Sequence, residues 1–277
     1  MRAQVIFGLI LAVPVAVLLY LLFGPALRRW RRRKLRAVAP PAGLEATLTR
    51  NVPLYPAMPA ELRRQLLGHV NVFLAEKNFI GCGGQEINDE IRYTVAGTAC
   101  ILLLNREPEY FPGFTSILVY PDTFASVNVQ YDGPVEVHER TARAGESWHR
   151  GPVVLSWGDV IRGVTDPVDG INVVLHEFAH KLDEQDSATD GLPELHELDH
   201  YAEWTEVLTR EYETLQKRAA RGSNHVLDDY GLESAAEFFA VATESFFEKA
   251  KAMRARLPDL YEQLRRYYRV DPATWKQ

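Results

Sequence analysis

The sequence is poor in cysteine. Only Cys82 and Cys100 occur among 277 residues, and neither lies in a C-x-x-C pair. This scarcity argues against a cysteine-based zinc knuckle and against a secreted disulfide framework, and it suits a reducing cytoplasm. Cys100 lies in an apolar run that is typical of a core. Cys82 lies in the loop sequence Gly-Cys-Gly-Gly, where a reactive thiol is a minor alternative.

Acidic residues are absent from the first 36 positions, which hold eight lysines and arginines. The remaining 241 residues hold 23 basic and 37 acidic residues, so their net charge is −14. The −6 of the whole chain is the sum of this value and the +8 of the first 36 residues. Hydrophobic residues make up 47% and charged residues 25%, which is ordinary globular usage and excludes wholesale disorder and a polytopic membrane protein. The acidic body argues against a direct nucleic-acid binder.

An uncharged apolar run, Val5–Phe23, fills most of the basic N-terminal segment. As a helix it would span about 28 Å, close to the thickness of a bilayer core. Only Arg2 precedes the run, whereas seven basic residues follow it between positions 28 and 36. A cleaved signal peptide needs the opposite order, and it and an interfacial helix are the alternatives. We expect residues 1–36 to form a single-pass anchor in the inner membrane, with the body in the cytoplasm.

The rest of the chain is predicted to be one mostly helical α+β domain with a small mixed β-sheet. Residues 37–57 are rich in proline and predict a linker, so the domain occupies residues 58–277. Apolar spacing and cap signals predict helices over residues 59–77, 89–105, 169–184, 195–221, 232–250 and 256–269. Short β-rich runs predict strands over residues 116–120, 124–129, 135–139 and 153–157.

One motif carries most of the chemical information. His176, Glu177 and His180 form an H-E-x-x-H pattern. Positions i and i+4 share a helical face, so the two histidines can bind one metal ion. Glu177 lies about 100° further round the helix, where it can reach water on the metal rather than the metal itself. Zinc acidifies such water, and a carboxylate at this position can take its proton.

A second H-E-x-x-H match spans His196–His200. The first match lies in an apolar stretch, and Phe178 and Ala179 separate its histidines. The second contains Asp199 and lies among further acidic residues, which is typical of a solvated helix face. We therefore assign the metal site to the first match.

A catalytic zinc usually has three protein ligands and one open position, so a third ligand is needed. Asp186 lies ten residues after His176, where metzincins place their last ligand, but Asp183 stands where that family needs a glycine. Asp183 and Glu184 are better explained as capping groups or as groups that orient a ligand.

The favoured third ligand is Glu237, on a later helix as in gluzincins. It lies in an apolar stretch, where an unpaired carboxylate is costly to bury and needs a metal or hydrogen-bond partner. Glu233, one turn earlier, is the main competitor. Glu233 or Glu244 could instead orient a ligand histidine.

Several segments together resemble the Mlc titration factor A family of bacterial zinc peptidases. They are DGINVVLHEFAHKLDEQD, the preceding PVVLSW and VYPDTF, and the later YGLESAAEFFAVATESFF, and the resemblance covers about residues 50–250. It implies a zincin-like metallopeptidase domain of gluzincin type, similar in its catalytic core to the C-terminal domain of anthrax lethal factor.

The resemblance also implies roles for individual residues. His176, His180 and Glu237 would hold one zinc ion per chain, Glu177 would be the general base, and Tyr230 would donate a hydrogen bond to the tetrahedral oxyanion. A further implied partner is the transcriptional repressor Mlc. The membrane anchor departs from the soluble members of this family.

The sequence thus predicts a membrane-anchored zinc peptidase that acts on peptides or proteins. The strand at Val153–Trp157 is either a sheet edge that binds substrate by strand addition or an ordinary core strand. Trp148 and His149 are placed no closer than the rim. One alternative is a non-catalytic protein that binds a repressor or another partner, although Glu177 would then have no purpose. The other is zinc-dependent hydrolysis of a non-peptide amide.

Overall fold

A computed structural model describes residues 23–122, 151–186, 189–195, 197–222 and 226–276. It confirms a mostly helical domain with a small sheet. The strands are β1 (Asn78–Gly81), β2 (Ser116–Tyr120) and β3 (Val153–Ser156). The principal helices are α2 (Leu44–Asn51), α3 (Leu54–Ala57), α4 (Ala60–Glu76), α5 (Asp89–Ile101), α6 (Trp157–Thr165), α7 (Val173–Asp183), α8 (His200–Ala219), α9 (Ala235–Glu248), α10 (Ala250–Arg256) and α11 (Pro258–Tyr268). Short 3₁₀ turns are η1 (Glu184–Asp186), η2 (Asp229–Leu232) and η3 (Pro272–Thr274).

The sheet has the order β1-β2-β3, and both pairings are parallel. The described strands therefore differ from the mixed sheet that was predicted. The predicted strands at 124–129 and 135–139 lie outside the described residues. β1 was not predicted, because it has only four residues and is mostly exposed, so it carries no alternating apolar pattern. Parallel pairing of β1 with β2 requires a crossover, and α5 provides it.

The predicted helices form, with shorter bounds. Asn88 caps α5 by accepting a hydrogen bond from the Ile91 amide at 2.9 Å. Two helices after residue 58 were not predicted. α6 begins at Trp157 because the Ser156 hydroxyl accepts from the Asp159 amide, which ends β3 one residue early. α10 continues after α9 beyond a break at Lys249, where a single helix was expected to end.

The linker interpretation of residues 37–57 is wrong for most of the segment. It contains α2 and α3, and Leu44 and Leu48 are fully buried in the core. Pro53 lies at the start of α3, a position where proline needs no amide hydrogen, so it does not interrupt the helices. The folded body thus begins well before residue 58.

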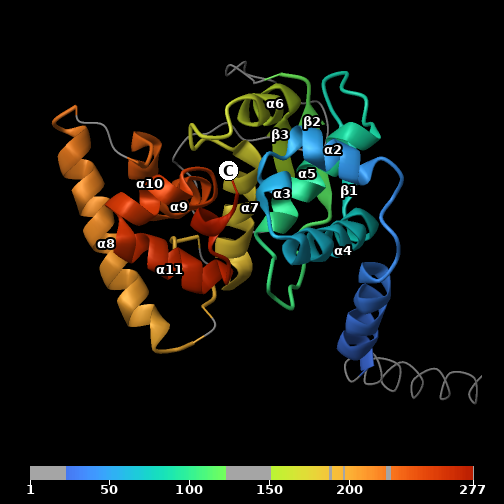
Figure 1. Cartoon of the computed structure of the whole chain (residues 1–277), viewed down its shortest axis with the longest axis horizontal. Coiled ribbons are helices and arrows are strands. Elements are labelled where there is room, and N and C mark those ends of the chain that lie inside the picture. The colour runs from blue at the N-terminus through green and yellow to red at the C-terminus, as the bar shows by residue number, and fades with distance from the viewer. Residues whose placement is uncertain (1–22, 123–150, 187–188, 196, 223–225, 277) are drawn as a thin grey trace, which may run out of the picture.

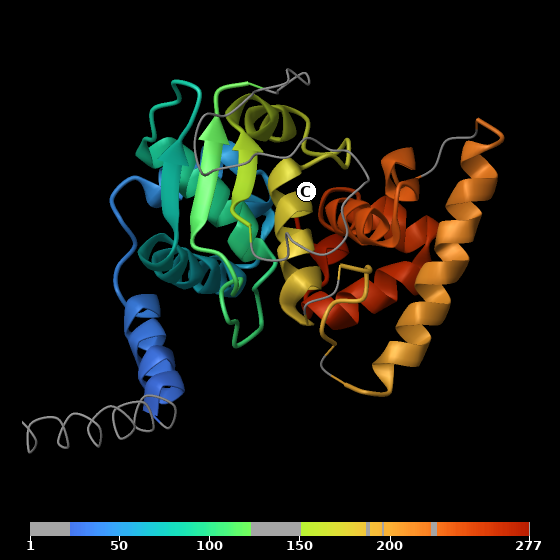
Figure 2. The same ribbon diagram turned by 180° about the vertical axis from the view of Figure 1, so that it is seen from behind.

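Helix α7 lies between two halves of the molecule (Figures 1 and 2). One half holds the sheet with α2 to α5, and the other holds α8 to α11. Phe178 of α7 packs into the first half, with ring centroids 4.8 Å from Phe111 and 5.6 Å from Phe73. The neighbouring face of α7 packs against α9 in the second half. The two halves therefore share one helix as a common wall.

A further helix over residues 23–36 stands beside α4, across the molecule from α8 (Figures 1 and 2). Arg32 holds it there, since its guanidinium donates to both carboxylate oxygens of Glu76 at 2.9 Å and to Glu109 at 2.8 Å. Within the described part of the chain, no helix combines the length and apolar character needed to cross a bilayer. All but the last residue of the predicted anchor Val5–Phe23 lies outside that part.

Candidate metal centre

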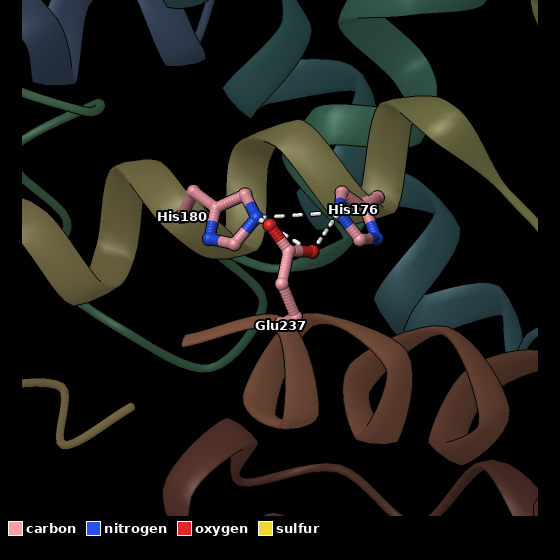
Figure 3. A group of neighbouring side chains, drawn as sticks. All are labelled: His176, His180 and Glu237. Atoms are coloured by element: carbon pink, nitrogen blue, oxygen red, sulfur yellow. Dashed lines mark hydrogen bonds and ion pairs between the residues drawn. The ribbon is translucent and has the colours of Figure 1, made fainter. Parts of the chain in front are cut away.

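Three predicted side chains converge at the face between α7 and α9 (Figure 3). Glu237 Oε2 lies 2.9 Å from His176 Nε2 and 3.5 Å from His180 Nε2, and the two Nε2 atoms are 3.2 Å apart. Among the described residues this is the one group of three or more His, Cys, Asp or Glu side chains close enough to hold a metal ion.

Local sequence explains why α7 presents both histidines. Asn172 caps the helix by accepting a hydrogen bond from the Leu175 amide at 3.1 Å, so the first turn is fixed just before the motif. Leu175, Phe178 and Ala179 are buried, which orients α7 and leaves the i, i+4 pair on the face toward α9.

Glu237 reaches the histidines from the first turn of α9. The Ser234 hydroxyl caps this helix by accepting from the Glu237 amide at 3.1 Å. Burial alone would raise the pKa of Glu237, but the two neighbouring histidines outweigh it and hold the pKa well below its usual range. The carboxylate is therefore an anion placed directly against two imidazoles.

The unsatisfied atoms of this group fit a metal ion. Glu237 Oε2 is buried and accepts no well-oriented hydrogen bond from the described residues, despite its short distances to both histidines. Two imidazole nitrogens that face each other at 3.2 Å also cannot both carry hydrogens. A cation bound between one carboxylate oxygen and two nitrogen lone pairs would satisfy all three atoms.

Glu244 orients His176 from behind. Its Oε1 lies 2.7 Å from His176 Nδ1, and its Oε2 accepts the backbone amide of Asn172. Burial lowers the pKa of His176, but the carboxylates of Glu237 and Glu244 outweigh it and raise the pKa to about 10. The surroundings thus favour positive charge here, and a proton on Nδ1 would leave Nε2 with its lone pair toward the site.

The other predicted site residues lie close by. Glu177 is half-buried on α7 and forms no hydrogen bond or ion pair with any residue that the structure describes. Its negative charge acts on His176 and contributes to the raised pKa of that histidine. Tyr230 lies in η2, and its ring centroid is 5.8 Å from that of His176. The group therefore contains a carboxylate and a phenol beside the three candidate ligands.

The competing candidates lie elsewhere. Glu233 precedes α9 and is exposed. In the second H-E-x-x-H match, His200 is buried and its Nε2 lies 2.6 Å from Gln263 Oε1, whereas His196 lies outside the described residues. Asp183 accepts the amide of Gly191 at 2.9 Å and so fixes the loop after α7.

Glu184 pairs with the buried Lys181 at 2.7 Å and is not one of the three candidate ligands. The side chain of Asp186 lies outside the described part, as do Trp148 and His149. Cys100 is buried in α5, and Cys82 directly follows β1. Neither cysteine forms a disulfide.

Sequence reasoning missed two residues that support the site, Asn172 and Glu248. The side chain of Asn172 donates from Nδ2 to Glu248 Oε1 at 2.9 Å. Its backbone N–H donates to Glu244 Oε2. Asn172 therefore connects the start of α7 to two carboxylates of α9. An asparagine just before an apolar periodic run is a helix-start signal, which could have identified Asn172.

Glu248 should make stability fall as the pH rises. Burial, with the nearby Glu244 and Asp169 charges, raises the pKa of Glu248 to about 8. The folded chain then keeps a proton that the unfolded chain releases above about pH 4.5, so stability is lost between pH 4.5 and 8. In the metal-free protein, Glu248→Gln should gain about 1–3 kcal/mol over wild type between pH 5 and pH 9, measured by urea unfolding.

The control for this experiment is Glu206→Gln, on the exposed face of α8. It should follow the wild-type curve at every pH. Parallel curves for wild type and Glu248→Gln would contradict the prediction.

Comparisons with known proteins agree with this geometry. The family model described as glucose-regulated metallo-peptidase M90 matches residues 27–269. Mlc titration factor A of Escherichia coli is 30% identical over 228 residues, which cover 80% of this chain and 84% of that protein. The Cronobacter sakazakii protein of the same name is 30% identical over 88% of this chain and 91% of its own length.

A protein of Synechocystis described as uncharacterized is 36% identical over 267 residues, 96% of this chain and 97% of its own length. That alignment leaves out only 4% of the chain, so it extends into the basic N-terminal segment. The family model spans most of the chain and includes all three candidate ligands. The chain therefore belongs to the M90 family of glucose-regulated metallopeptidases.

Proposed function

We propose that this chain is a zinc-dependent peptidase. The observation that carries the proposal is the convergence of two imidazole nitrogens and a buried, otherwise unsatisfied carboxylate oxygen between α7 and α9. Two histidines and one glutamate are one of the ligand sets of catalytic zinc sites, which keep an open position. Structural zinc sites use four protein ligands instead.

The surrounding residues have the chemistry that peptide hydrolysis needs. When bound, zinc supplies Lewis acidity to a carbonyl and to water. In this proposal Glu177 would take a proton from the attacking water and return it to the leaving amine. Tyr230, whose ring lies 5.8 Å from that of His176, would donate a hydrogen bond to the oxyanion that develops on the scissile carbonyl. Glu244 keeps the His176 ring in the orientation that ligation requires.

The sheet offers a place for an extended substrate. Within the described residues β3 pairs only with β2, and it leads through α6 toward α7. Val153 and Leu155 face the core, and Val154 is exposed. In this proposal an extended peptide adds by main-chain hydrogen bonds to the side of β3 that faces away from β2. We also propose that the apolar run Val5–Phe23 anchors the chain in the inner membrane with the peptidase domain in the cytoplasm.

A second candidate function is the binding of a repressor. Two relatives that are 30% identical to this chain carry the name Mlc titration factor A. Their alignments cover 80% and 88% of this chain, which supports the proposal of a similar partner here. The two functions differ in their dependence on Glu177, because binding a partner needs no general base.

The test of the peptidase is zinc-dependent cleavage by the full chain in uncharged detergent. Protein treated with a chelator is compared with the same protein after one equivalent of zinc is restored. The substrate is a mixture of unstructured peptides, and mass spectrometry detects the new termini. We expect cleavage only in the zinc-loaded sample. A folded chain that holds one zinc and cleaves none of the peptides would overturn the proposal, and retention of Mlc by that protein would favour the second function.

A further inference from the structure

The helix over residues 23–36 forms one wall of a cavity of about 380 Å³. Its opposite wall is the segment from Glu107 to Tyr110. Four arginines line the helix side, Arg29, Arg32, Arg33 and Arg36. Each of Arg32 and Arg33 lies three or four residues from Arg29 and from Arg36, so the four share one broad helical face.

The charges in this cavity are not balanced. Arg32 is satisfied by Glu76 and Glu109, and Arg36 lies 3.5 Å from the exposed carboxylate of Glu107. Arg29 and Arg33 form no ion pair or hydrogen bond with the residues that the structure describes. With Glu76 included, four guanidinium groups meet three carboxylates, so the cavity has a surplus of one positive charge.

The wall that carries these arginines is fixed in place. Arg32 is only 7% exposed, and its guanidinium lies 5.0 Å from the centroid of the Tyr110 ring. The Tyr110 hydroxyl in turn lies 2.8 Å from Nδ1 of the buried His69 on α4. These contacts hold the helix against the body. Arg29 and Arg33, which form no ion pair with the described residues, therefore line a space of defined shape.

We propose that this cavity binds a phosphate group. Arginine presents a planar fork of donors that matches phosphate oxygens two at a time, and Arg29 and Arg33 offer two such unpaired forks in the cavity lining. The proposal does not depend on the peptidase function.

Two sources can supply the phosphate, an anionic lipid headgroup or a soluble phosphate compound. The described part of the helix starts at Phe23, the last residue of the apolar run, and Arg29 lies about 9 Å along it from Phe23. If the run spans a bilayer, this distance places Arg29 at the level of the headgroups. The same guanidinium groups would accept a free phosphate from solution.

The test uses the full chain in uncharged detergent and a pair of matched variants. Arg29→Gln with Arg33→Gln removes the two unpaired cavity arginines. Arg28→Gln with Arg31→Gln removes the same charge from exposed residues outside the cavity lining. Titration calorimetry measures binding of inorganic phosphate and, separately, of short-chain phosphatidylglycerol. Thermal unfolding midpoints confirm that both variants remain folded.

We expect the cavity variant to bind about tenfold more weakly or worse, and the control to stay within about twofold of wild type. Binding of inorganic phosphate would identify a soluble phosphate as a source, and binding of the lipid alone would identify the headgroup. Equal weakening in both variants would mean that only general charge attracts the anion, and would overturn the proposal. So would failure of the wild type to bind either probe.

Discussion

Replacing Glu177 with glutamine should lower peptide hydrolysis by about 10²–10⁴-fold and leave the metal bound. Glutamine has nearly the same shape but cannot accept a proton, so the attacking water loses its base. The side chain is half-buried and forms no hydrogen bond or ion pair with the described residues, so the substitution breaks no contact that supports the fold. It is also outside the group of three candidate ligands.

The measurement is kcat/KM on a peptide that the wild type cleaves, together with zinc content. Glu233→Gln is the matched control, because Glu233 is an exposed glutamate close along the chain to the third candidate ligand. It should behave as wild type in both measurements. A Glu177→Gln variant that retains full activity would show that another group takes the proton. A variant that loses zinc as well would show that Glu177 belongs to the ligand set.

Replacing Glu237 with glutamine should weaken zinc binding by more than about 100-fold and abolish hydrolysis as a result. The carboxylate contributes the anionic ligand atom, and an amide oxygen in its place leaves the cation without compensating charge. Glu244→Gln should weaken binding by only about 10–100-fold, because Glu244 acts through the orientation of His176. Glu233→Gln should have no effect.

Competition with a chromophoric chelator gives the three affinities on one scale. The expected order, with the largest loss at Glu237 and none at Glu233, distinguishes a ligand from an orienting group and from a solvent-exposed neighbour. The ligand assignment fails if Glu237→Gln binds zinc as tightly as Glu233→Gln does. It also fails if Glu244→Gln suffers the larger loss.

The histidines of the site could be predicted because their position depends on helix periodicity alone. An i, i+4 pair faces one way wherever an apolar helix forms, and α7 does form there. The choice between Glu233 and Glu237 was harder, since one helical turn separates them and a continuous helix would place both on one face. The Ser234 cap decides it, because α9 begins at Ala235 and leaves Glu233 before the helix.

Other features depended on contacts between distant segments. Asn172 and Glu248 are separated by 76 residues, so their hydrogen bond follows from the packing of α7 on α9 rather than from any local pattern. β1 is too short for an alternating pattern and is held by its pairing with β2. The helices within residues 37–57 were hidden by prolines, which lie before α2, at the cap of α3 and within the short α3 itself, but not inside α2.

The position of α7 as a shared wall makes metal occupancy and folding parts of one equilibrium. An ion bound by His176, His180 and Glu237 would crosslink α7 to α9 and so tie the second half to the common helix. Free zinc at about 1,000 times the dissociation constant would then add about 4 kcal/mol to the free energy of unfolding. A chain that had lost its metal would open more readily between α7 and α9, so proteolysis would remove inactive molecules in preference to active ones.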